Sequence, residues 1–346
     1  MNKYRLLLSL MCLWLVGLSA CGPTAQSTLA PTAAPTVMPT QVPAAAPTTT
    51  PTVAPTAAPT AVPTTNASVY PLNVTDSANR KVAIAKQPQK VVSLAPSDTE
   101  ILFAIGQGSK LVAVDDFSDF PAEVKALPKV GGMKVNFEQI VALNPDLVLT
   151  AGITAPDTIK KLEDLKLTVV VISSAKTTMD SILRDITLTG QVMGAPDKAK
   201  QVTDAMQQKL NALKAKVASA KTKPKVYWEL DATDPSKPYT VGPGNFLNDI
   251  ITLAGGENVF GTASSPFPQV GAEQVVGANP EVIILSDAAY GITVESVKAR
   301  KGWEVISAVK NNKTFPIEDS LVSRPGPRVV DGLEAAIRLI HPELFQ

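Results

Sequence analysis

The sequence predicts an α/β protein with two Rossmann-like lobes that are joined by one long, rigid helix. Short runs of β-branched residues alternate with helical stretches, which is typical of sheets covered by helices. A 16-residue segment is repeated at an offset of 135 residues, and a long amphipathic segment lies between the two copies. Two similar halves and a helical connector predict a ligand cleft between the lobes.

The first half begins with a strand, a helix and a second strand. We expect the helix from Thr99 to Ile105, with Ser97 and Glu100 at the spacing of a capping box and Gly106 at the position of a C-terminal cap. By their apolar, β-branched composition, strands are expected at 91–94, 111–114, 147–150, 168–172, 225–230, 282–286 and 314–317.

The repeat is the strongest evidence for two lobes of one plan. Residues 135–150 (VNFEQIVALNPDLVLT) align with residues 270–285 (VGAEQVVGANPEVIIL), and six of the sixteen positions are identical, where chance would give about one. Each copy is typical of a short helix that ends at Asn-Pro and is followed by a buried strand. The alignment pairs Glu138 with Glu273.

Residues 196–219 are expected to form the connecting helix, about 35 Å long at 1.5 Å per residue. Their apolar side chains make one stripe: Val202, Met206, Leu210, Leu213 and Val217. This segment divides the globular part into an N-terminal lobe, 70–195, and a C-terminal lobe, 220–346. Because a helix connects the lobes rigidly, we do not expect a large domain closure.

The amino end predicts export. Lys3 and Arg5 precede an uncharged, mostly apolar run over 6–20, which is shorter than the ~20 residues that a transmembrane helix needs. The run closes on Leu18-Ser19-Ala20-Cys21, which resembles the lipobox of bacterial lipoproteins. We therefore expect a signal peptide over 1–20 and a lipid on Cys21. An ordinary signal peptide with an incidental cysteine is the alternative.

A linker follows the expected anchor. Residues 22–69 contain no charged side chain and have proline at every fourth position from Pro31 to Pro63. Such a Pro/Thr/Ala tract cannot build a core, so we expect residues 21–69 to be the lipidated cysteine and a disordered tether. Cys12 would leave with the signal peptide, and the mature chain could then form no disulfide.

Charge and motifs argue against several classes of function. The net charge of +1 argues against a nucleic-acid surface. His341 is the only histidine and is expected at a helix end or on the surface, so we expect no metal site. The sequence contains no G-x-S-x-G, Walker or G-x-G-x-x-G motif, so we expect no catalysis.

A surface-anchored enzyme stays an alternative, because two α/β lobes with a cleft also describe many enzymes. A structural protein on a stalk would leave the paired glutamates unexplained.

Four motifs in order resemble those of the helix-linked periplasmic binding proteins of ABC importers. They are VVSLAPSDTEILFAIG (91–106), DDFSDFP (115–121), PFPQVGAEQVV (266–276) and SRPGPRVVDGLE (323–334). The resemblance covers about residues 91–345 and favours the cobalamin-binding branch. It implies a monomer without a cofactor of its own, lipid-anchored at the outer face of the cytoplasmic membrane. This monomer would capture cobalamin or a related corrinoid and deliver it to a permease dimer. An iron-siderophore or haem binder is the alternative, although the single histidine disfavours haem.

The resemblance also implies site residues. Glu138 and Glu273 would meet arginines of the permease; the alternative is that they only favour the helix dipole. Aromatic faces pack on a flat macrocycle and an arginine can reach its amide or phosphate groups. The implied cleft residues are Phe117, Phe120, Phe267, Arg324 and Arg328, with Tyr239, Trp228 and Tyr227 as further walls. Core packing is the alternative for these aromatic residues. Cobalamin binders of this type often have tryptophans where this chain has Met133 and Phe267, which leaves the exact ligand open.

Overall fold

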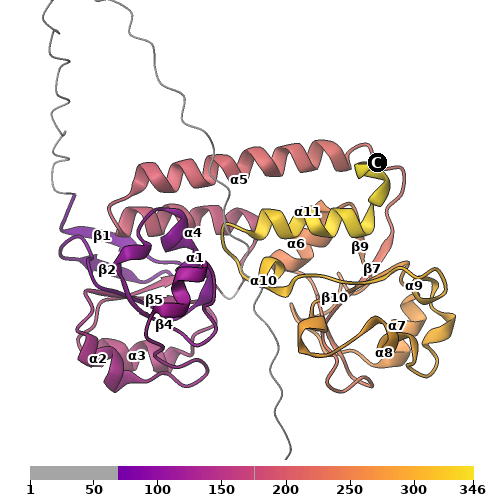
Figure 1. The fold of residues 1–346 in the computed structure, drawn as a ribbon, viewed down its shortest axis with the longest axis horizontal. Coiled ribbons are helices and arrows are strands. Elements are labelled where there is room, and N and C mark those ends of the chain that lie inside the picture. Colours follow the sequence, from indigo (N-terminus) through magenta and orange to yellow (C-terminus); the bar gives the residue numbers. More distant parts are fainter. Residues whose placement is uncertain (1–68, 175) are drawn as a thin grey trace, which may run out of the picture. The chain divides into compact units, whose positions relative to one another are not determined.

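The computed structural model describes residues 69–174 and 176–346 (Figure 1). The expected signal peptide, the lipidated Cys21 and nearly all of the expected linker lie outside the described residues. Within the part that is described, no helix is both long and apolar enough to cross a membrane. The lobe boundaries at 195 and 220 stay predictions, but the two sheets fall on either side of them.

The first sheet is parallel, with the strand order β4-β3-β5-β6. Its strands are β3 (Val91–Ser93), β4 (Leu111–Val114), β5 (Leu147–Ala151) and β6 (Val169–Ile172). The helices of this half are α1 (Pro96–Ala104), α2 (Phe137–Leu143), α3 (Pro156–Asp164) and α4 (Met179–Val192). A small antiparallel hairpin precedes them, made of β1 (Leu72–Thr75) and β2 (Lys81–Ile84). Nearly every residue of the four parallel strands is buried, because helices cover both faces of the sheet.

The second sheet has the order β11-β10-β7-β8, and β9 also pairs with β7. Its strands are β7 (Lys225–Asp231), β8 (Tyr239–Thr240), β9 (Glu257–Asn258), β10 (Val282–Leu285) and β11 (Thr314–Pro316). The helices are α6 (Phe246–Leu253), α7 (Ala272–Ala278), α8 (Val294–Lys298), α9 (Ser307–Lys310), α10 (Asp319–Val322) and α11 (Val329–Ile340). Only β8 is antiparallel to its neighbour, so the core of this sheet repeats the parallel plan of the first.

The expected connecting helix is present as α5 (Pro196–Val217), which runs alongside helices of both halves in Figure 1. It packs against α4 of the first half and α11 of the second. Its buried face carries Met206, Leu210 and Leu213. Lys209 adds ion pairs to Asp331 and Glu334 of α11, at 2.6 and 2.7 Å. The mixed α/β fold that the sequence predicts is confirmed.

One local prediction is wrong. Helix α1 begins at Pro96 and not at Thr99, and its N-cap, Ala95, has no side-chain hydrogen bond. Proline is favoured at the first helical position, where its missing N–H costs nothing, and it starts this helix three residues early. Ser97 and Glu100 therefore form no capping box, and Glu100 is buried with only 4% of its surface exposed. Gly106 lies just beyond the helix with a positive φ of 71°, as its predicted role requires.

Candidate functional site

A cavity of about 550 Å³ is lined by residues of both halves. This volume lies in the range of small-molecule sites. The first half contributes Ala95, Pro96, Ser97, Phe117, Ala151, Ile153, Ser173, Ser174 and Thr177, and the second contributes Leu230, Asn245, Phe246, Leu247, Phe267, Tyr290, Asp319, Ser323, Arg324 and Pro325. Most of these residues follow the carboxyl ends of parallel strands, where α/β sheets commonly bind ligands.

Large apolar side chains gather at this cavity without being buried. The exposed fraction is 54% for Phe117, 43% for Phe267, 89% for Ile153 and 77% for Tyr290. Phe117 and Ile153 come from the first half, and Phe267 and Tyr290 from the second. Exposed apolar side chains clustered in a concave site indicate a binding surface. A larger hollow of about 880 Å³ lies beside the β1–β2 hairpin and is lined by no residue of the second half. The cavity between the two halves is therefore the better candidate for the ligand site.

The sequence interpretation missed Ile153 and Tyr290. Ile153 follows β5 by two residues, and Tyr290 ends a 3₁₀ turn (Asp287–Tyr290) that follows β10. These are the two strands of the internal repeat. The repeat could therefore have nominated both side chains, because the carboxyl ends of equivalent strands meet the same crevice.

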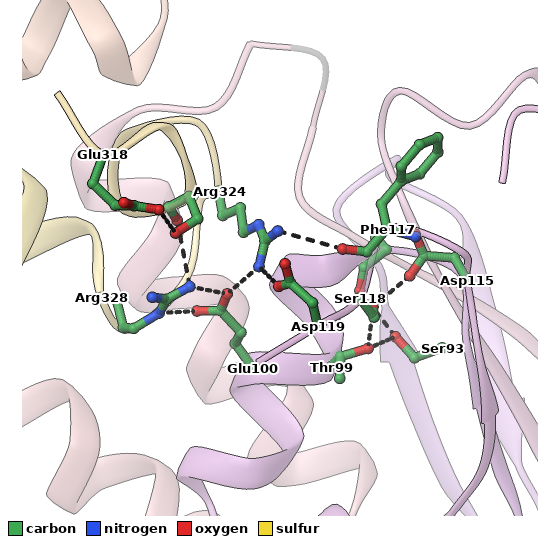
Figure 2. Close-up of polar contacts among 12 residues, drawn as sticks. Ser93, Thr99, Glu100, Asp115, Phe117, Ser118, Asp119, Glu318, Arg324 and Arg328 are labelled. Atoms are coloured by element: carbon green, nitrogen blue, oxygen red, sulfur yellow. Dashed lines mark hydrogen bonds and ion pairs between the residues drawn. The ribbon is translucent and has the colours of Figure 1, made fainter. Parts of the chain in front are cut away.

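The loop that carries Phe117 is held by a hydrogen-bonded cluster (Figure 2). Asp115 accepts hydrogen bonds from the backbone N–H of Phe117, at 3.1 Å, and from the hydroxyl of Ser118. Thr99 of α1 donates to Ser93 of β3 and lies 2.9 Å from the Ser118 hydroxyl. Burial raises the pKa of Asp115, although the hydrogen bond from Ser118 opposes this effect. These hydrogen bonds hold the backbone of the loop at Phe117, and the Phe117 ring points away from the cluster (Figure 2).

Arg324 lines the cavity, but its charge is already paired. Its Nη1 lies 2.6 Å from Oδ1 of Asp119 and 3.2 Å from Oε1 of Glu100, and its Nη2 donates to the carbonyl of Phe117 at 3.3 Å. Burial alone would lower the pKa of Arg324, but the hydrogen bonds to Asp119 and Glu100 raise it overall. The hydrogen bond from Arg324 in turn lowers the pKa of Asp119. A ligand anion would have to compete with two carboxylates for this guanidinium.

Arg328 and Phe120 lie beside the cavity and do not line it. Arg328 donates to both carboxylate oxygens of Glu100, at 2.9 and 2.6 Å, and its guanidinium lies 3.9 Å from the ring centroid of Phe120. Tyr239 on β8 is 44% exposed and is also absent from the lining. These three residues were expected at the cleft, and the structure brings only Phe117, Phe267 and Arg324 of the predicted set into its lining.

Trp228 requires a correction. The sequence interpretation offered it as a wall of the cleft, but its side chain is fully buried in β7. Its Nε1 donates to the hydroxyl of Ser286 at 2.6 Å. Tyr227 is equally buried and packs edge-on against Phe260 and Trp303. A central strand buried on both faces places successive side chains in core on either side, so neither residue reaches a ligand.

Glu138 and Glu273 lie in the first turns of α2 and α7, and both are exposed. Within residues 69–174 and 176–346, neither glutamate takes part in an ion pair. Both carboxylates are thus accessible to a partner. His341 follows α11 as expected but is fully buried, with Nδ1 2.9 Å from Glu343. The described residues contain no cluster of three or more side chains that could hold a metal ion.

Two α/β halves, a helical connector and a cavity lined from both halves define a two-lobed binding protein. The sequence profile of the periplasmic binding protein family matches residues 91–321. The chain belongs to this family, whose members are substrate-binding proteins rather than enzymes. Those that serve ABC transporters bind small ligands and deliver them to a membrane permease.

Two relatives show the family independently. An ABC transporter substrate-binding lipoprotein of Bacillus subtilis, YvrC, is 35% identical over 80% of this chain and 88% of its own length. A vitamin B12-binding protein of Vibrio parahaemolyticus is 33% identical over 73% of this chain and 90% of its own length.

Solved structures agree with this fold. The periplasmic vitamin B12-binding protein BtuF of Vibrio cholerae is 28% identical, with a TM-score of 0.65 over 75% of this chain and 99% of its own. A possible iron-binding periplasmic protein of Staphylococcus epidermidis is also 28% identical, with a TM-score of 0.65 over 74% of this chain and all of its own.

Proposed function

We propose that this chain is an extracytoplasmic solute-binding lipoprotein that captures cobalamin or a related corrinoid and delivers it to an ABC importer. The observation that carries the proposal is the pair of exposed phenylalanines, Phe117 and Phe267, which enter one cavity from opposite halves. Aromatic faces on two sides suit a flat macrocycle. The similarity to vitamin B12-binding proteins supports the same ligand class.

The lining contains two charged side chains, Arg324 and Asp319, and is otherwise uncharged, which suits a ligand bound mainly by packing and neutral hydrogen bonds. The charge of Arg324 is already paired with Glu100 and Asp119. The cavity should therefore bind a ligand rich in amide groups more tightly than a small anion. Ser174 and Tyr290 add hydroxyl groups to the lining. A corrinoid carries amide substituents around an apolar ring and therefore suits these walls. An iron siderophore is the second candidate, which the similarity to a possible iron-binding protein favours.

The remaining parts of the proposal concern delivery. Cys21 is the lipid attachment site and residues 22–69 are the tether, so the protein works at the outer face of the cytoplasmic membrane. The chain acts as a monomer without catalysis or a cofactor of its own. Glu138 and Glu273 dock on the two halves of a permease dimer, which their equivalent and exposed positions support.

Calorimetric titration of the purified mature chain tests the ligand assignment. We expect 1:1 binding of cobalamin and a ligand whose mass is unchanged after incubation. Phe117→Ala and Phe267→Ala should each lower the affinity by about tenfold, because each removes an aromatic contact. Tyr239→Ala, an exposed aromatic residue outside the lining, is the matched control and should change it less than about twofold. No heat with cobalamin beside saturable binding of a ferric siderophore would assign the chain to the iron branch.

A further inference from the structure

Glu100 is a buried carboxylate of the first half whose ion-pair partners come from the second half. It lies on α1, and both of its ion-pair partners, Arg324 and Arg328, belong to the segment between α10 and α11. In Figure 2 the two guanidinium groups converge on this one side chain. The side chains of Arg324 and Arg328 are 16% and 19% exposed, and that of Glu100 only 3%.

Glu100 has no role in its own helix that would explain this position. It forms no capping box, and a buried acid in the body of a helix loses hydration that only strong partners restore. The partners are strong here, since Arg328 binds both oxygens of the carboxylate, at 2.6 and 2.9 Å. Such a two-point contact fixes orientation as well as distance.

The same contacts extend to the wall of the cavity. Arg324 joins Glu100 to the side chain of Asp119 and to the backbone carbonyl of Phe117. Phe120, in the same loop, stacks on Arg328. The loop that presents Phe117 is therefore tied to the second half through the two arginines that Glu100 holds.

We propose that Glu100 is a positioning residue that clamps the two halves together and thereby sets the ligand affinity. Glu100 does not line the cavity, so it would act on the ligand only through other residues. Its carboxylate holds Arg324 and Arg328, which fix the separation of the halves and the place of Phe117 before the ligand arrives. A preorganised site loses less freedom on binding, so its ligand dissociates more slowly. The affinity part of this proposal rests on the proposed function.

The chain contains a matched control. Glu229 is also a buried glutamate held at both oxygens by an arginine, at 2.5 and 2.8 Å from Arg300, but both residues belong to the second half. Neither lines the cavity. Glu100→Gln and Glu229→Gln each remove one buried charge from an arginine pair, and both should destabilise the fold. Only Glu100→Gln should change the distance between the two halves.

Two readouts test the clamp in the mature chain, residues 21–346, with Cys21→Ser, which then contains no other cysteine. Spin labels at Lys125→Cys and Lys301→Cys, exposed positions of the two halves, report the distance between them by pulsed electron paramagnetic resonance. We expect Glu100→Gln to broaden the ligand-free distance distribution and to lower cobalamin affinity by about tenfold, mainly through faster dissociation. Glu229→Gln should leave the distances unchanged and the affinity within about twofold.

The proposal requires both changes. An unchanged distance distribution, or an affinity that stays within twofold, overturns it. If Glu100→Gln does not fold, Arg328→Lys replaces it, because Arg328 does not line the cavity and lysine keeps the charge but cannot bind both oxygens of Glu100 in the same way. The distance distribution must then broaden and the affinity must fall, as expected for Glu100→Gln. If the unmodified chain binds no cobalamin and no ferric siderophore, the proposed function fails, and the distance measurement alone decides whether the clamp exists.

Discussion

Asn144 and Asn279 end the two repeated helices with nearly the same backbone conformation. Their φ angle is 46° in both cases, and ψ is 61° and 62°. Asparagine is one of the few side chains that tolerate this left-handed region, so both copies stop their helix in the same way before a proline. Glu138 and Glu273 lie six residues before these caps and are therefore held at equivalent points of the two halves.

Reversal of both glutamates tests the docking role. Glu138→Arg together with Glu273→Arg should abolish ligand-dependent uptake, because a surface that faces arginines would meet like charge. Each single reversal should reduce uptake less, since one half can still engage. Uptake in proteoliposomes is measured beside ligand titration, in which affinity should stay within about twofold because both side chains lie outside the cavity. Normal uptake by the double variant would leave the glutamates as first-turn acids only.

Substitution of Trp228 tests its assignment to the core. Trp228→Phe should lower the free energy of unfolding by ~1–3 kcal/mol, because it removes the hydrogen bond to Ser286 and part of a buried ring. Ligand affinity should stay within about twofold. Urea unfolding followed by circular dichroism measures the first effect, and Ser286→Ala, which leaves the indole N–H without its acceptor, is the parallel variant. A tenfold loss of affinity at unchanged stability would return Trp228 to the ligand site.

Asp287 should make stability depend on pH. Burial, and after it the nearby negative charge of Glu229, raises the pKa of Asp287 to about 6. One oxygen accepts the backbone N–H of Ala232 at 3.0 Å, and the other has no partner among the described residues. The folded chain thus holds a proton that the unfolded chain releases near pH 4, so this group's contribution to stability is present below pH 4 and is lost as pH rises to about 6.

Asp287→Asn isolates this contribution. The amide can still accept from Ala232 but carries no charge, so the variant should be more stable than the parent at pH 7.5 by ~1–2 kcal/mol. The gain should shrink toward zero as the pH falls to 4, where the parent is protonated. Urea unfolding at a series of pH values measures the difference, and a gain that does not vary with pH would contradict the assignment.

Cys21 should decide where the protein resides. Cys21→Ser should leave the chain unlipidated and move it from the membrane fraction to the soluble fraction, because the acyl chains would supply the anchoring energy. Cell fractionation with a high-salt wash measures the shift. If the variant still sediments with membranes after the wash, the lipoprotein assignment is wrong.

The sequence predicts the large elements well because their signals are local. The strand expected at 111–114 is β4 without change, and those expected at 147–150 and 225–230 differ from β5 and β7 by one residue. Buried runs of Val, Ile and Leu carry this information. The hairpin β1–β2 and the two-residue strands β8 and β9 were not predicted, since such short strands depend on their neighbours more than on their own residues.

The site is less predictable because it depends on distant pairs. Glu100 and Arg324 are 224 positions apart, and nothing near either residue indicates the other. The sequence could nominate Arg324 for the cavity but could not show that its charge is already satisfied. The start of helix α1 was also mispredicted. Ser97 and Glu100 have the spacing of a capping box, but Pro96 is the first helical residue, so both lie inside the helix.

The two buried indoles have an optical consequence. Trp228 and Trp303 both belong to the second half, and the sequence's remaining tryptophan, Trp14, falls in the segment expected to be removed on export. Intrinsic indole fluorescence of the mature protein would therefore come from one half alone. Melting of the first half would be silent at these emission wavelengths, so comparison with a whole-chain probe would show whether the halves that Glu100 joins lose their structure together or in turn.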